Sequence, residues 1–387
     1  MQHFDLIIVG GGLAGASLAL ALRDTRWRIA LVEASPPRRP EGWDARIYAV
    51  SPANARFLEG IGVWRHLDAS RIAPIQAMEV QGDHGGRLGF TAYETGVPEL
   101  GWILESSLMA CELWEGVKRQ PNLTLFCPAQ PLDLEFRHDA AVLKLSDGQA
   151  LSARLLVGAD GRDSWVRQRA GLEAKVSHYP QHGVVANFQA SRPHRGVAYQ
   201  WFGPEGILAY LPLPDNRMSM VWSAPEALAQ ELCGLPAQAL CQRVRDAGHG
   251  VLGDLELLTP AAAFPLRLIR VPQTVTPRLA LVGDAAHGIH PLSGHGINLG
   301  FQDARVLAGL LAALPAWQDP GQLRFLQRYQ RERREETVLM QTTTDALQRM
   351  FASPLPGMSL LRNAGLSLTD RLPFVKNALV RYALGAI

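Results

Sequence analysis

Three glycine-containing turns carry residue types that can bind a nucleotide. The first, Gly10-x-Gly12-x-x-Gly15, follows the apolar run 4–9 and precedes a helical pattern over residues 16–23. In such a turn the first glycine allows the tight bend, the second lets the backbone approach a pyrophosphate, and the third lets helix and strand pack closely. The helix N-terminus would supply amide donors and partial positive charge to the phosphates. We expect a dinucleotide-binding βαβ unit here; a glycine turn without a ligand is the alternative.

Glu33 is placed to bind the sugar of that nucleotide. It ends the second apolar run, 27–32, and lies 18 residues after Gly15, close to the ~20 residues expected for a carboxylate that binds ribose hydroxyls. Because a carboxylate repels a 2′-phosphate, the site suits the adenosine of FAD or NAD and not NADP. The residues expected at the ADP half are Gly10, Gly12, Leu13, Ala14, Gly15 and Glu33.

Two further glycine turns follow apolar, strand-like runs. Gly158-Ala159-Asp160-Gly161 ends the run 151–157, and Gly283-Asp284-Ala285-Ala286-His287 ends the run 278–282. A plain dehydrogenase needs neither turn. In open α/β sheets, ligands bind at the carboxyl ends of the strands. We therefore expect all three turns at one edge of a parallel sheet.

The last turn and the glycine-rich stretch after it have groups suited to a flavin. Asp284 can accept hydrogen bonds from a ribityl chain. The backbone amides of residues 294–298 can place a helix N-terminus against the electron-rich pyrimidine edge of an isoalloxazine. Such a helix would stabilise the negative charge of a reduced flavin.

Between the turns, the residue pattern changes to alternating and aromatic segments typical of an antiparallel sheet over 176–270. The stretch 70–91, with a glycine-rich hairpin at 82–86, is a candidate to join that sheet. Helices are expected over 296–314 and 322–351. The strands expected in the antiparallel region are 184–189, 197–202, 208–213 and 218–222.

Composition narrows the class of protein. The chain has 387 residues, enough for two or three domains, and 38 basic against 36 acidic residues give a net charge of +2, which argues against a nucleic-acid partner. The four cysteines are far apart, so we expect neither a disulfide framework nor a zinc site. The N-terminus reads directly into a strand, and we expect no signal peptide and a cytoplasmic location.

Together, the motifs G-x-G-x-x-G, G-A-D-G-x-x-S-x-x-R and G-D-A-A-H-x-x-x-P-x-x-G-x-G-x-N resemble those of single-component FAD monooxygenases of the para-hydroxybenzoate hydroxylase fold. Within that group the sequence is most similar to the ubiquinone-biosynthesis hydroxylase family, and the resemblance spans nearly the whole chain. The segments that carry this narrower likeness are 44–51, 58–64, 202–204, 209–213, 219–222, 362–366 and 372–376.

The resemblance implies an α/β fold: a Rossmann-like FAD-binding domain (GR2-type) with an inserted, mostly antiparallel β-sheet substrate domain and C-terminal helices. The implied boundaries are 1–74, 101–175 and 271–345 for the discontinuous FAD-binding domain, 75–100 and 176–270 for the substrate domain, and 346–387 for a C-terminal helical segment.

The resemblance also assigns cofactor-binding residues beyond the ADP half. It makes Arg46 a flavin-contacting residue and Asp160 the acid of a motif shared between FAD and the nicotinamide donor. One departure is Glu105, where many relatives have an arginine, so we assign it no flavin contact. The residues matched to the flavin ring and ribityl chain are Gly283, Asp284, Pro291, Gly294, Gly296, Ile297 and Asn298.

The implied chemistry belongs mainly to the cofactor. NADH or NADPH would reduce FAD, and reduced flavin would react with O2 to give a C4a-hydroperoxide that hydroxylates an electron-rich phenol ring. The protein would exclude water and hold the ring in place. The sequence has no second dinucleotide fingerprint, so the nicotinamide is expected to visit transiently, and no metal is required. The implied substrate is a polyprenylated phenol of ubiquinone biosynthesis.

Several side chains have two interpretations. His287 is a candidate catalytic residue that tunes the flavin or handles substrate protons, or it packs beside its turn and bonds to backbone; His290 and His295 are equally ambiguous. The candidates for an aromatic substrate pocket are Tyr199, Trp201, Tyr210 and Trp222, with ordinary sheet packing as the alternative for each. The charged run 328–336 is expected to be a solvated helix face with intrahelical ion pairs.

The C-terminal segment could close the core, dock a partner or rest on a membrane. Phe374, Val375, Ala378, Leu379 and Tyr382 share one helical face,. A polyprenyl substrate favours peripheral contact with the inner membrane and a place in a ubiquinone-biosynthesis complex. Two other functions stay open: hydroxylation of a small soluble phenol, and a non-catalytic lipid carrier or assembly subunit.

Overall fold

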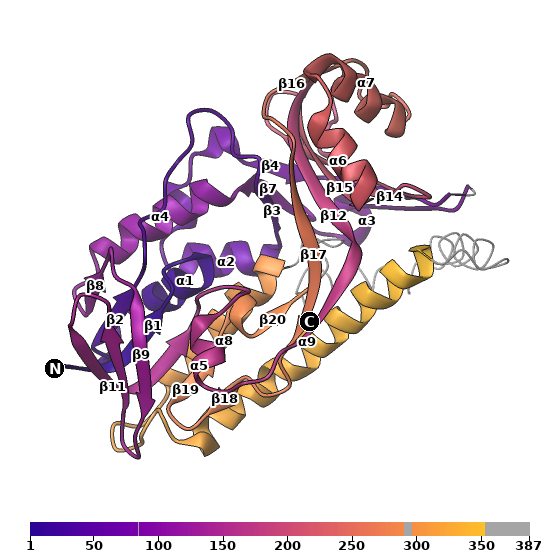
Figure 1. Ribbon diagram of the computed structural model, residues 1–387. Coiled ribbons are helices and arrows are strands. Elements are labelled where there is room, and N and C mark those ends of the chain that lie inside the picture. The colour runs from indigo at the N-terminus through magenta and orange to yellow at the C-terminus, as the bar shows by residue number, and fades with distance from the viewer. Residues whose placement is uncertain (84, 290–295, 353–387) are drawn as a thin grey trace.

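The computed structural model describes residues 1–83, 85–289 and 296–352 (Figure 1). Around the first expected strand, these residues form a sheet of eight strands that we call the parallel sheet, because its central strands β19, β11, β1, β2 and β8 run parallel. Its strands are β1 (Gln2–Val9), β2 (Ile29–Val32), β8 (Leu123–Phe126), β9 (Pro131–Phe136), β10 (Ala141–Leu145), β11 (Ala150–Gly158), β18 (Val275–Thr276) and β19 (Leu279–Leu281).

The parallel sheet is covered on both faces, which explains its continuous apolar runs. In β1, Leu6 and Ile8 point into a core formed with α1, α4 and α8. The alternate residues Ile7 and Val9 point into a second core, formed with β10 and α5. The helices are α1 (Leu13–Ala21), α2 (Pro52–Gly60), α3 (Ala92–Thr95), α4 (Ser106–Lys118), α5 (Trp165–Arg169), α6 (Glu226–Gly234), α7 (Ala237–Ala247), α8 (Gly296–Ala312) and α9 (Leu323–Ala352).

The region expected to be antiparallel forms a second sheet, of nine strands in the described ranges, which we call the large sheet. The stretch expected to join it does so: β5 pairs with β13, in parallel, and β6 pairs with β5. Its strands are β5 (Ala77–Gln81), β6 (Arg87–Thr91), β12 (Lys175–Ala190), β13 (Val197–Gly203), β14 (Gly206–Leu213), β15 (Arg217–Pro225), β16 (Leu255–Leu257), β17 (Ala262–Arg270) and β20 (His287–Gly288).

The two faces of the large sheet have different neighbours. Val184, Ala186 and Phe188 of β12 pack in one core with α6 and α7, which lie at the top of Figure 1, beside β15 and β16. Asn187, on the opposite face, donates from Nδ2 to the carbonyl oxygen of Asp44 at 2.9 Å. One face is therefore closed by helices, and the other is turned toward the rest of the molecule.

The expected strands and helices are confirmed, but several other elements were not expected. The sequence interpretation gave no helices within 176–270, where α6 and α7 lie, and it missed β9 and β10. It also missed a small sheet of β3 (Ile47–Val50), β7 (Gly101–Glu105) and β4 (Ala73–Ile75). These strands are too short for an alternating pattern to identify them. The short 3-10 helices are η1 (Trp64–His66), η2 (Ala69–Arg71) and η3 (Gly283–Ala285).

The expected helical face at residues 374–382 lies outside the described residues, and the domain boundaries remain predictions. Within the described ranges, no helix combines the length and the apolar character needed to cross a bilayer.

Candidate functional site

The three glycine turns meet at one edge of the parallel sheet. The amide of Ala159 donates to the carbonyl oxygen of Val9 at 2.8 Å, and the amide of Val282 donates to that of Gly158 at 2.9 Å. Strands β1, β11 and β19 therefore end side by side, as expected for a ligand site in an open α/β sheet. The turns approach closely: a Cβ added to Gly10 would lie 2.4 Å from the carbonyl oxygen of Ala159.

The first turn has the shape that a pyrophosphate requires. A Cβ on Gly15 would lie 1.9 Å from the carbonyl oxygen of Gly10, so only glycine allows this packing of helix against strand. At Gly12, which is exposed, a Cβ would meet no atom within 4 Å. The N-terminus of α1 has no capping side chain and no acidic residue in its first turn. Its amides are open to phosphate oxygens, so these residues fit the cofactor half expected here.

Glu33 is fixed beside this turn. One carboxylate oxygen accepts from the amide of Gly11 at 2.6 Å and the other from the amide of Ser35 at 3.1 Å. The side chain is half-buried at the end of β2. A carboxylate held at this point suits a ribose hydroxyl, as the spacing indicated.

The second turn is organised by Asp160 and Arg167. Asp160 accepts from the hydroxyl of Ser164 at 2.5 Å and from the amide of Val166 at 2.9 Å, so its carboxylate caps α5. Arg167, which is buried, donates to the carbonyl oxygen of Ala285 at 2.9 Å. Burial lowers the pKa of this guanidinium. Arg167 therefore joins the second turn to the third.

The third turn packs directly on α1 and α8. Gly283 has a φ of +61°, and a Cβ there would lie 3.0 Å from the Cβ of Ala14. A Cβ on Gly300 would lie 3.5 Å from that same atom. Asp284 is half-exposed, and in the described part of the chain its carboxylate has no hydrogen-bond partner. The contact of this carboxylate with a ribityl chain remains a prediction.

Below the third turn lies a buried charged network that was not expected. Asp303 of α8 accepts from the amide of Gly283 at 2.9 Å, from His287 Nε2 at 2.6 Å and from Arg333 Nε at 2.7 Å. All three side chains are nearly sealed from solvent. Burial alone would raise the pKa of Asp303, but His287 and Arg333 reverse this and hold its pKa below the usual value. Among the described residues, the His287 ring therefore bonds a carboxylate through Nε2, where the alternative interpretation expected a bond to backbone.

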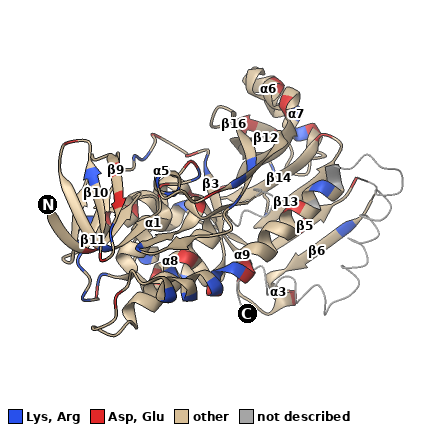
Figure 2. Cartoon of the chain, turned by 60° about the horizontal axis from the view of Figure 1, so that its bottom comes forward, with Lys and Arg blue, Asp and Glu red and all other residues tan. Residues whose placement is uncertain are grey.

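The expectation of a solvated face over 328–336 is wrong at Arg333. Arg328 and Glu332 do form an exposed intrahelical pair, and Figure 2 shows basic and acidic residues along α9. Arg333, however, is 6% exposed and reaches α8. Its pKa is raised by Asp303 despite the opposing effect of burial. The charge run alone could not show which arginine faces inward.

Asn298 was expected at the flavin ring, and its side chain is used elsewhere. Its Oδ1 accepts from the amide of Ser51 and from Asn54 Nδ2, both at 2.9 Å, and its Nδ2 donates to the carbonyl oxygen of Ala49 at 2.8 Å. The side chain therefore joins α8 to β3 and α2, and the flavin contact expected of the backbone amide remains a prediction. Gly296 and Ile297 begin α8. The other predicted residues here, His290, Pro291, Gly294 and His295, lie outside the described residues.

Arg46 lies next to Tyr48 and within electrostatic reach of the third turn. Its guanidinium carbon is 5.6 Å from the centre of the Tyr48 ring. The pKa of Arg46 is raised mainly by Tyr48, with smaller contributions from Asp284 and Asp44. Two residues predicted for the flavin site, Arg46 and Asp284, are therefore brought to the same region by β3 and η3.

The four aromatic pocket candidates lie on the helix-covered face of the large sheet. Trp201, Tyr210 and Trp222 are buried in the core with α6 and α7, and Tyr199 packs against it. Tyr199 stacks on Trp201 with ring centres 5.7 Å apart, and the hydroxyl of Tyr210 donates to the carbonyl oxygen of Val244 in α7. The structure thus gives them packing partners among the helices, on the side away from the glycine turns.

The opposite face of the large sheet has a half-buried apolar centre. Three of its residues lie opposite one another on neighbouring strands: Val185 of β12, Val221 of β15 and Ala209 of β14. Leu211, two residues after Ala209 in β14, lies on the same face and is also half-buried. We call these four residues the sheet patch. Asn187, which contacts Asp44, lies on this face next to them. Alternation within each strand distinguishes the two faces, but only the position of α6 and α7 shows which face is open.

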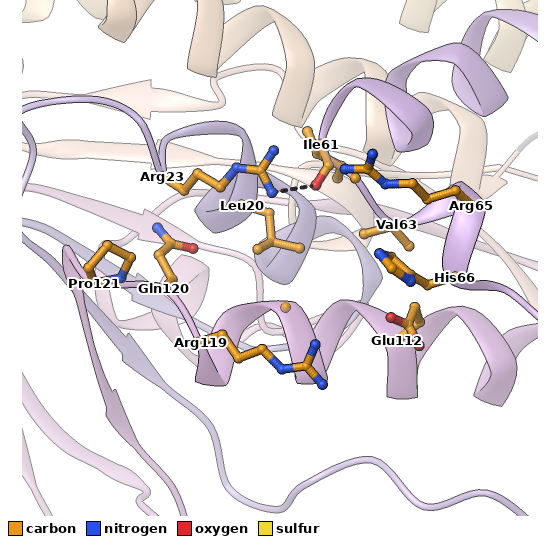
Figure 3. Close-up of a pocket in the computed structure, with 12 residues that line it drawn as sticks. Leu20, Arg23, Ile61, Val63, Arg65, His66, Glu112, Arg119, Gln120 and Pro121 are labelled. Carbon is orange, nitrogen blue, oxygen red and sulfur yellow. Dashed lines mark hydrogen bonds between the residues drawn. The ribbon is translucent and has the colours of Figure 1, made fainter.

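A cavity of about 190 Å³ lies apart from these turns (Figure 3). It is lined by the C-terminal end of α1, by the connection from α2 to η1 and by the end of α4. Leu20 and Arg23 line it, whereas the glycine turns lie at the opposite end of α1. This cavity is therefore separate from the candidate cofactor site.

The fold and the three turns define a flavoprotein with a Rossmann-like FAD site. The family described as "FAD binding domain" matches residues 3–344. The chain is 36% identical to ubiquinone hydroxylase UbiL of Rhodospirillum rubrum, over 99% of this chain and 90% of that protein. It is 34% identical to 3-demethoxyubiquinol 3-hydroxylase of Escherichia coli, over 99% of both chains. The chain belongs to the FAD-dependent monooxygenase family of ubiquinone-biosynthesis hydroxylases.

Solved structures with lower identity share the fold. PqsL of Pseudomonas aeruginosa, in complex with 2-aminobenzoylacetate, has a TM-score of 0.79 at 22% identity and covers 94% of this chain and 99% of its own. The p-nitrophenol 4-monooxygenase PnpA of Pseudomonas putida has a TM-score of 0.81 at 17% identity and covers 99% of both chains. The expected fold class is confirmed.

Proposed function

We propose that this FAD-dependent monooxygenase hydroxylates the aromatic ring of a polyprenylated phenol in ubiquinone biosynthesis, with NADH or NADPH and O2 as co-substrates. The observation that carries the proposal is the near-full-length similarity, at 36% identity, to a protein named ubiquinone hydroxylase. FAD, when bound, supplies the oxygen chemistry. The chain's own residues bind the cofactor, orient the ring and exclude water.

The sheet patch supports a substrate with a large apolar part. Val185, Ala209, Leu211 and Val221 are half-buried on the face turned toward Asp44, and none has a polar side chain. Apolar surface left partly uncovered is typical of a binding site. We propose that the phenol ring and the start of its polyprenyl tail lie against this patch.

Quinone analysis tests the proposed reaction. Deleting the gene should lower ubiquinone and cause a less hydroxylated polyprenyl precursor to accumulate, and restoring the wild-type gene should reverse both changes. Unchanged ubiquinone with no new precursor would contradict the proposal. With purified protein, NAD(P)H oxidation stimulated by a water-soluble phenol alone would favour a small soluble substrate. Bound FAD without stimulation by either phenol class would favour a carrier or assembly subunit.

We also propose contact with the membrane, because a polyprenylated substrate partitions into lipid. The segment suggested for this contact, residues 374–382, has an apolar helical face in the sequence. The full-length protein should float with vesicles of bacterial lipids in a density gradient. Recovery of all protein in the lipid-free fractions would contradict membrane contact without affecting the proposed reaction.

A further inference from the structure

We propose that Glu105 is a positioning residue for Arg46. Together with Arg71 it fixes residues 42–46, which we call the domain clasp, between the small sheet of β3, β7 and β4 and the large sheet. The inference rests on the proposed flavin contact of Arg46 and is independent of which phenol is hydroxylated. It also gives a role to the residue at which this sequence departs from the arginine of many relatives.

Glu105 is a buried carboxylate with three charged or polar donors. It ends β7, and 1% of its side chain is exposed. Arg71 donates to it from two nitrogens, Nε at 2.6 Å and Nη2 at 2.7 Å, and the amide of Asp44 donates to it at 2.6 Å. Glu105 raises the pKa of Arg71 through this pairing. A two-point guanidinium–carboxylate pair of this kind fixes geometry as well as charge.

The same arginine also holds the start of the clasp. Arg71 Nη2 donates to the carbonyl oxygen of Gly42 at 2.6 Å. Its guanidinium carbon lies 4.3 Å from the centre of the Trp43 ring, and that of Arg217 lies 5.1 Å from the same centre. Arg217 belongs to β15 of the large sheet. Trp43 therefore contacts one cation from η2 and one from the large sheet,.

Asp44 and the first residues of α4 hold the backbone of Arg46 in place. Asp44 accepts from the amide of Arg46 at 2.8 Å and from the amide of Ser107 at 3.1 Å, so it caps α4 from outside the helix. The amide of Ser106 donates to the carbonyl oxygen of Arg46 at 2.8 Å. From the large sheet, Asn187 holds the carbonyl oxygen of Asp44. The backbone of Arg46 is thus held at its amide by the carboxylate of Asp44 and at its carbonyl oxygen by the amide of Ser106.

The charge on Glu105 is what makes this arrangement strong. A buried carboxylate needs its donors, because burying an unpaired charge is unfavourable. Glutamine at this position would keep the shape but lose the charge-assisted bonds to Arg71 and to the Asp44 amide. The clasp would then open more often, and Arg46 would be held in place for less of the time.

Hydrogen exchange and FAD affinity test the inference without any substrate. In Glu105→Gln, the amides of residues 42–46 should exchange faster, and the apoprotein should bind FAD about tenfold more weakly, the effect of losing one charged hydrogen bond. Arg46→Ala should also weaken FAD binding. If Glu105 acts through Arg46, the double variant should bind FAD no more weakly than Arg46→Ala alone. Should Glu105→Gln not fold, Arg71→Lys keeps the charge but loses the two-point pairing and gives the same test.

Glu135→Gln is the matched control, because it removes one charge from the exposed pair of Glu135 and Arg137. This variant should change neither the hydrogen exchange of residues 42–46 nor the affinity for FAD. Additive effects of Glu105→Gln and Arg46→Ala, or unchanged exchange at 42–46, would overturn the positioning role while leaving the proposed reaction intact. Unchanged FAD affinity in Arg46→Ala would overturn the flavin contact of Arg46 and, with it, this inference. A failure of the proposed hydroxylation would show only in the quinone analysis.

Discussion

The imidazole of His287 and the carboxylate of Asp303 lie 2.6 Å apart in a region almost closed to solvent. Asp303 also holds the amide of Gly283, the glycine that begins the third turn, and the guanidinium of Arg333 from α9. One carboxylate therefore connects the third turn to two helices. The turn is positioned by a tertiary ion pair as well as by its own sequence.

Asp303→Asn should destabilise the protein strongly. The variant leaves Arg333 buried without its full countercharge, and breaking a buried pair in this way costs about 3–5 kcal/mol. Urea unfolding of the apoprotein measures the change. The control Asp133→Asn, which alters an exposed pair with Lys144, should change the unfolding free energy by less than about 1 kcal/mol. Equal effects of the two variants would contradict the importance of the buried network.

Asp303 should also contribute to acid sensitivity. Its pKa is lower in the folded protein than its usual value, so its stabilising effect is present above about pH 4, the unfolded value, and is lost as the pH falls below it. Between about pH 4 and its folded pKa, the unfolding free energy of the wild type should fall more steeply than that of Asp303→Asn. Unfolding curves at a series of pH values test this; parallel pH profiles would contradict it.

Alanine substitutions at two glycines of the first turn should have different effects on stability and on FAD binding. At Gly12 the Cβ would meet no protein atom, whereas at Gly15 it would lie 1.9 Å from the carbonyl oxygen of Gly10. Gly12→Ala should therefore leave the melting temperature of the apoprotein unchanged but weaken FAD binding by roughly tenfold or more, because the methyl group faces the pyrophosphate. Gly15→Ala should lower the melting temperature even without FAD. Normal FAD affinity in Gly12→Ala would place the pyrophosphate elsewhere.

A substitution on the open face of the large sheet should affect substrate binding, whereas one on the helix-covered face should affect stability. Val221→Phe adds bulk to the sheet patch, so it should raise the KM for the polyprenylated phenol with little change in the unfolding free energy. Tyr210→Phe removes the hydrogen bond to α7, so it should destabilise the protein by about 1 kcal/mol and leave KM unchanged. Steady-state kinetics and urea unfolding of both variants test this. The reverse pattern would place the substrate on the helix-covered face.

The three turns could be predicted because each depends on residues close together in the sequence. The spacing of Gly10, Gly12 and Gly15 after an apolar strand defines a local shape, and parallel pairing then brings the strand ends together. The same local logic gave the distance from Gly15 to Glu33. The FAD-binding domain was therefore accessible from sequence alone.

The remaining features depend on which elements pack against each other, and no local pattern contains this information. Arg333 looked like one charge in an exposed run until α9 was placed against α8. Glu105 and Arg71 are 34 residues apart, and their pairing required the end of β7 to lie beside η2. Alternation assigned residues such as Trp222 to one face of a strand, but α6 and α7 decided which face was covered. Side chains far apart in the chain meet only when the helices and sheets are assembled, because burial, and with it the strength of charge pairing, is set by tertiary packing.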